Sequence, residues 1–91
     1  MKKEISVIIP AYNEEQLLEG TVESVVDYFR RRHYTLEALI VNDGSTDRSA
    51  EVLKALHAQD AAVRVVRFNR NYGQHAAVFA GMERARGDVV V

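Results

Sequence analysis

Three short polar segments of the sequence hold the side chains best suited to binding a ligand. They cover residues 10–15, 42–47 and 69–75, and each follows a run of apolar, largely β-branched residues. Together the segments offer carboxylates, amides, an arginine side chain and the rings of two tyrosines. Rings can stack on a base, polar side chains can bind base and ribose, and the start of a following helix attracts phosphate. The set therefore favours a nucleotide as the ligand.

The common phosphate-binding loops are missing from these segments. The sequence contains neither the G-x-x-x-x-G-K-[ST] P-loop nor a G-x-G-x-x-G turn after its first apolar run. We therefore expect a metal ion to hold the phosphates. The chain of 91 residues has no cysteine, which excludes disulfides and thiolate zinc sites. Its net charge of −1 gives no general attraction to nucleic acid, so we expect no nucleic-acid partner.

The elements that must position these segments follow a regular alternation. Apolar runs predict strands, and the segments between them show helical periodicity. Alternation of this kind predicts a Rossmann-like, three-layer α/β/α fold with a parallel sheet in the order β-α-β-α-β-α-β. Ligands bind such sheets outside the carboxyl ends of the strands, where the three polar segments would meet. The predicted strands are 5–9, 36–41, 63–68 and 89–91, and the predicted helices are 14–32, 47–58 and 74–86.

Local signals refine the predicted helices. Asn13 is suited to cap the first helix, with Gln16 completing a capping box, and Ser45 or Thr46 is suited to cap the second. The third helix is rich in alanine and glycine, which predicts close packing on the sheet, and Gly87 fits its C-terminus. The valines that follow predict a buried strand, so we expect the chain to be truncated there.

Two of the polar segments carry a family likeness. Residues 7–15 and 41–47 resemble the opening of family 2 glycosyltransferases of the GT-A fold, and Gly87-Asp88 before the last strand agrees with it. Residues 70–77 resemble the polyprenyl-phosphate branch, which includes the dolichol-phosphate and undecaprenyl-phosphate sugar transferases. The resemblance implies that residues 1–91 are the nucleotide-sugar-binding N-terminal part of a catalytic domain.

The resemblance also assigns roles to individual residues. The family usually has aspartate at position 42, where this chain has Asn42, but the neighbouring Asp43 is present. The family's Asp-x-Asp motif follows the fourth strand, so ligands for Mg²⁺ or Mn²⁺ and catalytic groups are expected beyond Val91, with none within the chain. The nucleotide-binding residues implied by the resemblance are Pro10, Tyr12, Glu14, Val41 and Asp43.

The third segment adds candidates that could meet phosphate or line the site, namely Arg70, Asn71 and Gln74. Simpler interpretations stay open for several residues. Tyr12 could pack against the protein, Arg70 could be solvated, and Asp43 could belong to a turn and helix cap. Thr46 and Asp47 are interpreted as turn and cap residues only, and His75 as structural.

The resulting hypothesis is inverting, metal-assisted transfer of a sugar from a nucleotide-sugar, with UDP favoured by the resemblance, to a polyprenyl phosphate. The 91-residue chain alone is expected to be inactive, because the metal ligands lie beyond it. The whole protein is expected at the cytoplasmic face of the membrane, and an exposed sheet edge could support oligomerisation. Two alternatives are a nucleotidyltransferase, whose Gly-rich basic loop is missing here, and a non-catalytic flavodoxin-like regulatory domain.

Overall fold

The computed structural model describes residues 4–91 and confirms the predicted alternation of strands and helices. All strand pairs are parallel, and the sheet has the order β3-β2-β1-β4. Each element boundary lies within a few residues of the prediction. The elements are β1 (Glu4–Ala11), α1 (Glu15–Arg31), β2 (Thr35–Asn42), α2 (Ser49–Gln59), β3 (Val63–Arg67), α3 (Gln74–Arg84) and β4 (Val89–Val90).

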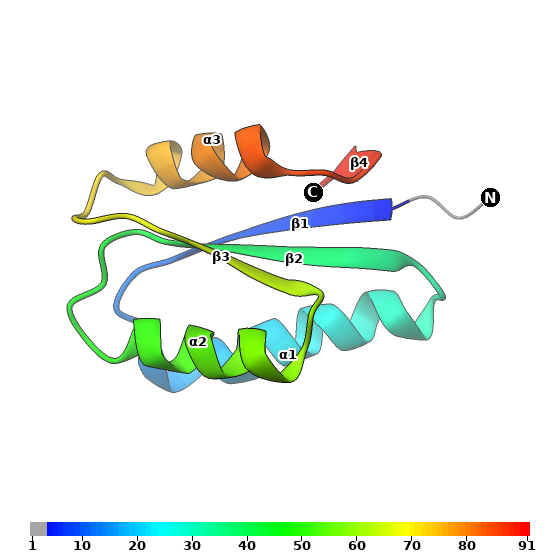
Figure 1. Cartoon of the computed structure of the whole chain (residues 1–91), viewed down its shortest axis with the longest axis horizontal. Helices are drawn as coiled ribbons and strands as arrows, with labels where there is room; N and C mark the ends of the chain where they lie inside the picture. Colours follow the sequence, from blue (N-terminus) through cyan, green and yellow to red (C-terminus); the bar gives the residue numbers. More distant parts are fainter. Residues whose placement is uncertain (1–3) are drawn as a thin grey trace.

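Helices cover both faces of the sheet, as Figure 1 shows: α1 and α2 lie on one face and α3 on the other. The core fills the space between the sheet and the α1/α2 layer, where buried branched side chains of the strands meet apolar stripes of the two helices. Burial on both faces of β2, the strand with seven consecutive buried residues, explains its nearly continuous apolar run. Among residues 4–91, no helix combines the length and apolar character needed to cross a membrane.

The small residues of α3 allow it to lie close to the sheet, as predicted. Ala77 is completely buried. A Cβ atom placed on Gly81 would lie 2.5 Å from Cγ2 of Ile8, well inside van der Waals contact. Position 81 therefore accepts only glycine at this helix–sheet distance.

The predicted helix caps are wrong. Asn13 has φ +50 and lies before Glu14, so it does not cap α1. Instead, the start of α1 is bound by the loop before α2 and by the first residue of α2: Glu15 N–H donates to Asp47 Oδ2 at 3.2 Å and Glu14 N–H to Ser49 Oγ at 3.3 Å. Asp47 also accepts the Ser49 N–H at 2.9 Å, the bond that was expected from Ser45 or Thr46.

The chain after α3 also departs from expectation. The helix ends at Arg84 with Ala85 extended, so Gly87 is not its terminal residue. A Cβ on Gly87 would lie 2.6 Å from Ser6 Oγ, which shows that this glycine is needed for close approach to β1. The terminal valines are not buried: β4 forms the edge of the sheet, and Val89, Val90 and Val91 are 41%, 45% and 63% exposed.

A buried polar network holds the residues after α3 against the sheet. Sequence reasoning did not predict this network. Glu37, only 5% exposed on β2, accepts hydrogen bonds from the Ser6 hydroxyl, the Arg64 guanidinium and, at 2.6 Å, Arg86 N–H. Gly87 N–H donates to Ser6 Oγ at 2.8 Å. Burial acts to raise the pKa of Glu37, but the hydrogen bonds from Ser6, Arg86 and Arg64 outweigh it and lower that pKa.

Candidate functional site

The three polar segments meet at the carboxyl ends of the strands, on the left of Figure 1. They surround a hollow of about 410 Å³, a volume within the range of small-ligand sites. Six of the eight residues predicted for the site line this hollow together. The complete lining is Pro10, Ala11, Tyr12, Glu14, Asp43, Asn71, Gly73 and Gln74.

Asp43 holds the loop between β3 and α3 in place. Asp43 is only 3% exposed. Its Oδ1 accepts a hydrogen bond from the Tyr72 N–H at 2.8 Å, and its Oδ2 accepts hydrogen bonds from the Gly73 N–H at 3.0 Å and the Asn71 amide at 3.1 Å. Its own N–H donates to Ala11 O at 2.8 Å. The two oxygens of a carboxylate offer about four acceptor positions, so capacity for a further donor remains.

Gly44 lets the second loop touch the backbone of the third. It has φ +68, a conformation that strains any residue with a Cβ. A Cβ at this position would lie 2.1 Å from Arg70 C and 2.4 Å from Asn71 N, both backbone atoms. The contact between these two loops therefore requires glycine.

Asn13 joins the first loop to the second. Its Oδ1 accepts the N–H groups of Thr46 at 2.7 Å and Asp47 at 3.3 Å, while its own N–H donates to Ser45 Oγ at 3.0 Å. Asn42 stabilises the same turn, because its Oδ1 accepts the Ser45 N–H at 3.1 Å. The polar side chains that resemble simple turn and cap residues in the sequence thus hold two distant loops together.

Two predicted residues do not line the hollow. Val41 is completely buried and pairs with Pro10 in the sheet, so its side chain belongs to the core. The Arg70 guanidinium lies 4.9 Å from the centre of the Tyr72 ring, over which it stacks. Tyr12, by contrast, is 43% exposed within the hollow's lining and offers an accessible ring.

The hollow's acidic groups are few. Asp43 and Glu14 come from different loops, and Asp43 already accepts three hydrogen bonds. Across residues 4–91, no three metal-binding side chains are grouped closely enough to hold an ion. Mg²⁺ and Mn²⁺ require a larger set of oxygen ligands, so the residues of this hollow do not fit a complete metal site.

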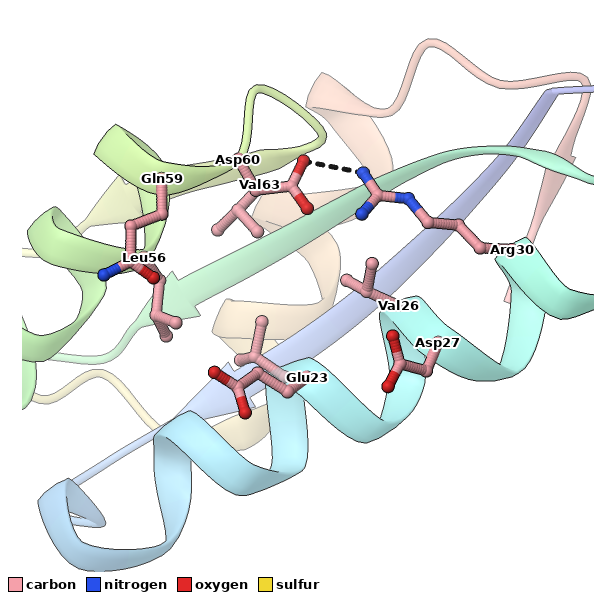
Figure 2. A pocket seen from close by; sticks show the side chains of 9 residues that line it. Glu23, Val26, Asp27, Arg30, Leu56, Gln59, Asp60 and Val63 are labelled. Atoms are coloured by element: carbon pink, nitrogen blue, oxygen red, sulfur yellow. Dashed lines mark hydrogen bonds and ion pairs between the residues drawn. The ribbon is translucent and has the colours of Figure 1, made fainter.

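A second hollow lies between α1 and α2, toward the amino ends of the strands, and is shown in Figure 2. It has a volume of about 300 Å³, and its lining includes the core residues Val26 and Val63. At the edge of this hollow, Arg30 Nη2 forms an ion pair with Asp60 Oδ1 at 2.7 Å, which the dashed line in Figure 2 marks. The Arg30 hydrogen bond lowers the pKa of Asp60. This hollow shares no lining residue with the three-loop hollow. Because Arg30 belongs to α1 and Asp60 directly follows α2, we interpret the Arg30–Asp60 ion pair as a contact between the two helices.

The sequence model of glycosyl transferase family 2 matches residues 6–91. Among curated relatives, undecaprenyl-phosphate 4-deoxy-4-formamido-L-arabinose transferases are similar to the chain. The one from Pseudomonas fluorescens (strain Pf-5) is 46% identical over 88 residues, which cover 96% of this chain and 26% of the relative. The one from Pectobacterium carotovorum is 44% identical over 90 residues, covering 98% and 28%. The chain thus spans about a quarter of the length of these relatives.

Solved structures share the fold. A mannosyltransferase from Pyrobaculum calidifontis, solved with GDP-mannose and Mn²⁺, aligns with a TM-score of 0.82 and 24% identity, covering 99% of this chain and 26% of its own. TarS residues 1–349 from S. aureus align with a TM-score of 0.79 and 25% identity, covering 100% and 26%. These likenesses agree with the predicted GT-A architecture.

Proposed function

The chain belongs to glycosyl transferase family 2, and on that basis we propose that it is the nucleotide-sugar-binding N-terminal part of a glycosyltransferase catalytic domain. The donor site is the three-loop hollow. The observation that carries the proposal is that Tyr12, Asp43 and Asn71, which come from three separate loops, line one hollow. The family match favours this proposal over a nucleotidyltransferase or a regulatory domain, and residues 10–13 lack the Gly-rich basic loop expected of a nucleotidyltransferase.

Within the hollow, the proposed base and ribose contacts come from the first two loops. The accessible ring of Tyr12 stacks on the base, while Glu14 and the remaining acceptor capacity of Asp43 bind N–H and hydroxyl groups. Pro10 shapes the wall. Val41 acts only from the core, behind the wall, because its side chain is buried.

The third loop is proposed to meet the diphosphate. Helix α3 begins at Gln74, beside the hollow, and its first N–H groups carry partial positive charge. The Gln74 amide adds hydrogen-bond donors, and Arg70 adds a cation at the edge of the same loop. Asn71 only lines the wall, because its amide N–H groups donate to Asp43 O at 3.2 Å and Asp43 Oδ2 at 3.1 Å. These groups orient the diphosphate but cannot neutralise all its charge.

A Mg²⁺ or Mn²⁺ ion supplies the remaining neutralisation of the leaving nucleoside diphosphate in the proposed enzyme. The Mn²⁺ bound to the similar Pyrobaculum mannosyltransferase supports this choice of metal. Because the hollow offers too few oxygen ligands, we expect those ligands in residues outside this chain.

The proposed acceptor is undecaprenyl phosphate, and the sugar is 4-deoxy-4-formamido-L-arabinose, as the relatives' names indicate. A phosphate acceptor is already anionic at neutral pH, so it needs less help from a general base than a sugar hydroxyl. Its direct attack on the anomeric carbon, with departure of the nucleoside diphosphate, inverts that carbon. A lipid acceptor places the whole protein at the membrane, and we propose its cytoplasmic face.

The test is calorimetric titration of the full-length protein with UDP and GDP in the presence of Mn²⁺, followed by a transfer assay with the UDP-linked sugar and undecaprenyl phosphate. UDP is expected to bind more tightly than GDP. Tyr12→Ala should weaken UDP binding by about tenfold through loss of stacking. Tyr28→Ala is the matched control, because Tyr28 is also half-exposed but lies on α1. Equal loss in the two variants, or no nucleotide binding, would contradict the proposal.

A further inference from the structure

A third hollow, of about 390 Å³, lies along the outer side of β3, between this strand and α2. Its lining includes Lys54 from α2, Arg67 from β3 and Asn42 from the end of β2. None of its lining residues borders the three-loop hollow, so the two sites are separate.

The charge around this hollow is positive and largely uncompensated. Lys54 and Arg67 are exposed, and neither forms an ion pair within residues 4–91. A third cation of the lining, Arg64, is neutralised by Glu37. Two free cations from different elements therefore face the same space, where an anionic group would be attracted.

Asn42 adds a hydrogen-bond donor to these cations. The residue is 1% exposed, and its Oδ1 is occupied by the Ser45 N–H. Its Nδ2 group makes no hydrogen bond within residues 4–91. Every fully enclosed side-chain nitrogen or oxygen of these residues has a hydrogen-bond partner, so Nδ2 cannot be fully enclosed. The Nδ2 group therefore keeps slight contact with solvent, and Asn42 is among the residues that line this hollow. A buried donor next to two cations is suited to an oxyanion.

The remaining lining consists of His57, whose Nδ1 is hydrogen-bonded to Val63 O at 2.6 Å, and of apolar residues. Val65, 37% exposed on β3, and Ala50 of α2 both contribute to the lining. An inorganic ion would leave this apolar surface in water, whereas an anion with a short hydrocarbon group would cover it. The volume is also larger than one phosphate needs.

We propose that the hollow between α2 and β3 binds an oxyanion that carries an apolar group, such as an alkyl phosphate, through Asn42 Nδ2, Lys54 and Arg67. The proposal does not rest on the nucleotide-sugar function, because the two hollows share no lining residue. Loss of one site would leave the other measurable.

The experiment is titration of the ¹⁵N-labelled protein with hexyl phosphate, followed by amide chemical shifts. The largest shifts are expected at the Asn42 side-chain amide and along residues 64–67. Asn42→Asp is the decisive variant, because it keeps an acceptor for the Ser45 N–H but replaces the donor with a negative charge. It should weaken binding at least about tenfold, and Lys54→Ala or Arg67→Ala about threefold to tenfold each.

Arg48→Ala is the matched control. Arg48 is an exposed cation beside the first turn of α2, is paired with Glu51 at 3.4 Å, and does not line this hollow. Its removal changes the net charge by the same amount as Lys54→Ala and should leave binding unchanged. Unchanged amide spectra away from the substitution would show that each variant is folded.

Inorganic phosphate is expected to bind about tenfold or more weakly than hexyl phosphate. Equal binding of the two would overturn the proposal, since the apolar surface would then contribute nothing. It would also be overturned if Asn42→Asp bound hexyl phosphate as well as the unaltered protein, or if the shifts lay only around the three-loop hollow.

Discussion

The carboxylate of Asp43 accepts the backbone N–H of Tyr72 at 2.8 Å, so a residue at the end of β2 fixes the loop that follows β3. The same side chain accepts the Gly73 N–H and the Asn71 amide. Asp43 therefore holds in place the loop that is proposed to meet the diphosphate. Its effect on ligand binding would be partly indirect, through the position of that loop.

Replacement of Asp43 by alanine tests this relationship. The change removes the acceptor for three donors in the third loop, and we expect a loss of about 3 kcal/mol in the free energy of unfolding. Hydrogen exchange at the Tyr72 and Gly73 amides should accelerate more than exchange in β1. Asp27→Ala, at an exposed carboxylate on α1, is the control and should change neither quantity. Unaltered exchange at both amides in Asp43→Ala would contradict the assigned role.

Gly44 offers a second test of the same loop contact. Gly44→Ala introduces a Cβ against the backbone of residues 70 and 71 and forces φ +68 on alanine, so it should destabilise the protein by about 2 kcal/mol or more. Thermal unfolding measures the change. Gly20→Ala is the control, since a Cβ there meets nothing within 4 Å and helix propensity favours alanine. The Gly20→Ala variant should be slightly stabilised. A Gly44→Ala protein as stable as the unaltered protein would contradict the described contact.

Much of the fold was accessible from the sequence, because it depends on patterns that act over short distances. The apolar runs and helical periodicity predicted every strand and helix, and parallel pairing followed from their alternation. The convergence of three loops followed from the same topology, since carboxyl ends of parallel strands share one edge. The position of Tyr12 beside Asp43 and Asn71 needed no knowledge of side-chain contacts.

The details that sequence reasoning missed depend on contacts between distant residues. Asn13 and Asp47 have the composition of local caps, but their oxygens bind N–H groups more than thirty residues away. Glu37 gave a signal that could have been used: a carboxylate inside an otherwise apolar strand must find partners if it is buried. Its partners Ser6 and Arg86 could not be identified without the register of the sheet.

The network around Glu37 predicts a specific dependence of stability on pH. The folded pKa of Glu37 is lowered relative to its ordinary value of about 4.3. A lowered carboxyl pKa stabilises the fold above the unfolded pKa, and this stabilisation is lost as the pH falls through the folded value. The stability difference between the unaltered protein and Glu37→Gln should therefore be largest at neutral pH and shrink below about pH 4.3.

Urea unfolding at several pH values measures this difference. Asp47 and Asp60, whose pKa values are lowered by hydrogen bonds from Ser49 and Arg30 respectively, lose stabilisation in the same direction. They remain in both proteins, so subtraction removes their contribution. Glu51→Gln, an exposed glutamate with a single surface ion pair, is the control and should show a small difference at every pH. A difference that stayed constant down to the acid transition would show that ionised Glu37 is not the stabilising species.

Asn13 gives the last prediction, in which backbone strain and hydrogen bonding act in opposite directions. Glycine at this position would relieve the cost of φ +50 but remove the Oδ1 that accepts the N–H groups of Thr46 and Asp47. Aspartate would keep the acceptor and tolerate this conformation nearly as well. If the bond between the loops dominates, Asn13→Gly should lower the free energy of unfolding by about 1 kcal/mol, while Asn13→Asp should change it little. Hydrogen exchange at Thr46 should accelerate only in the glycine variant, and a stabilised glycine variant with protected Thr46 would show that the backbone conformation alone joins the two loops.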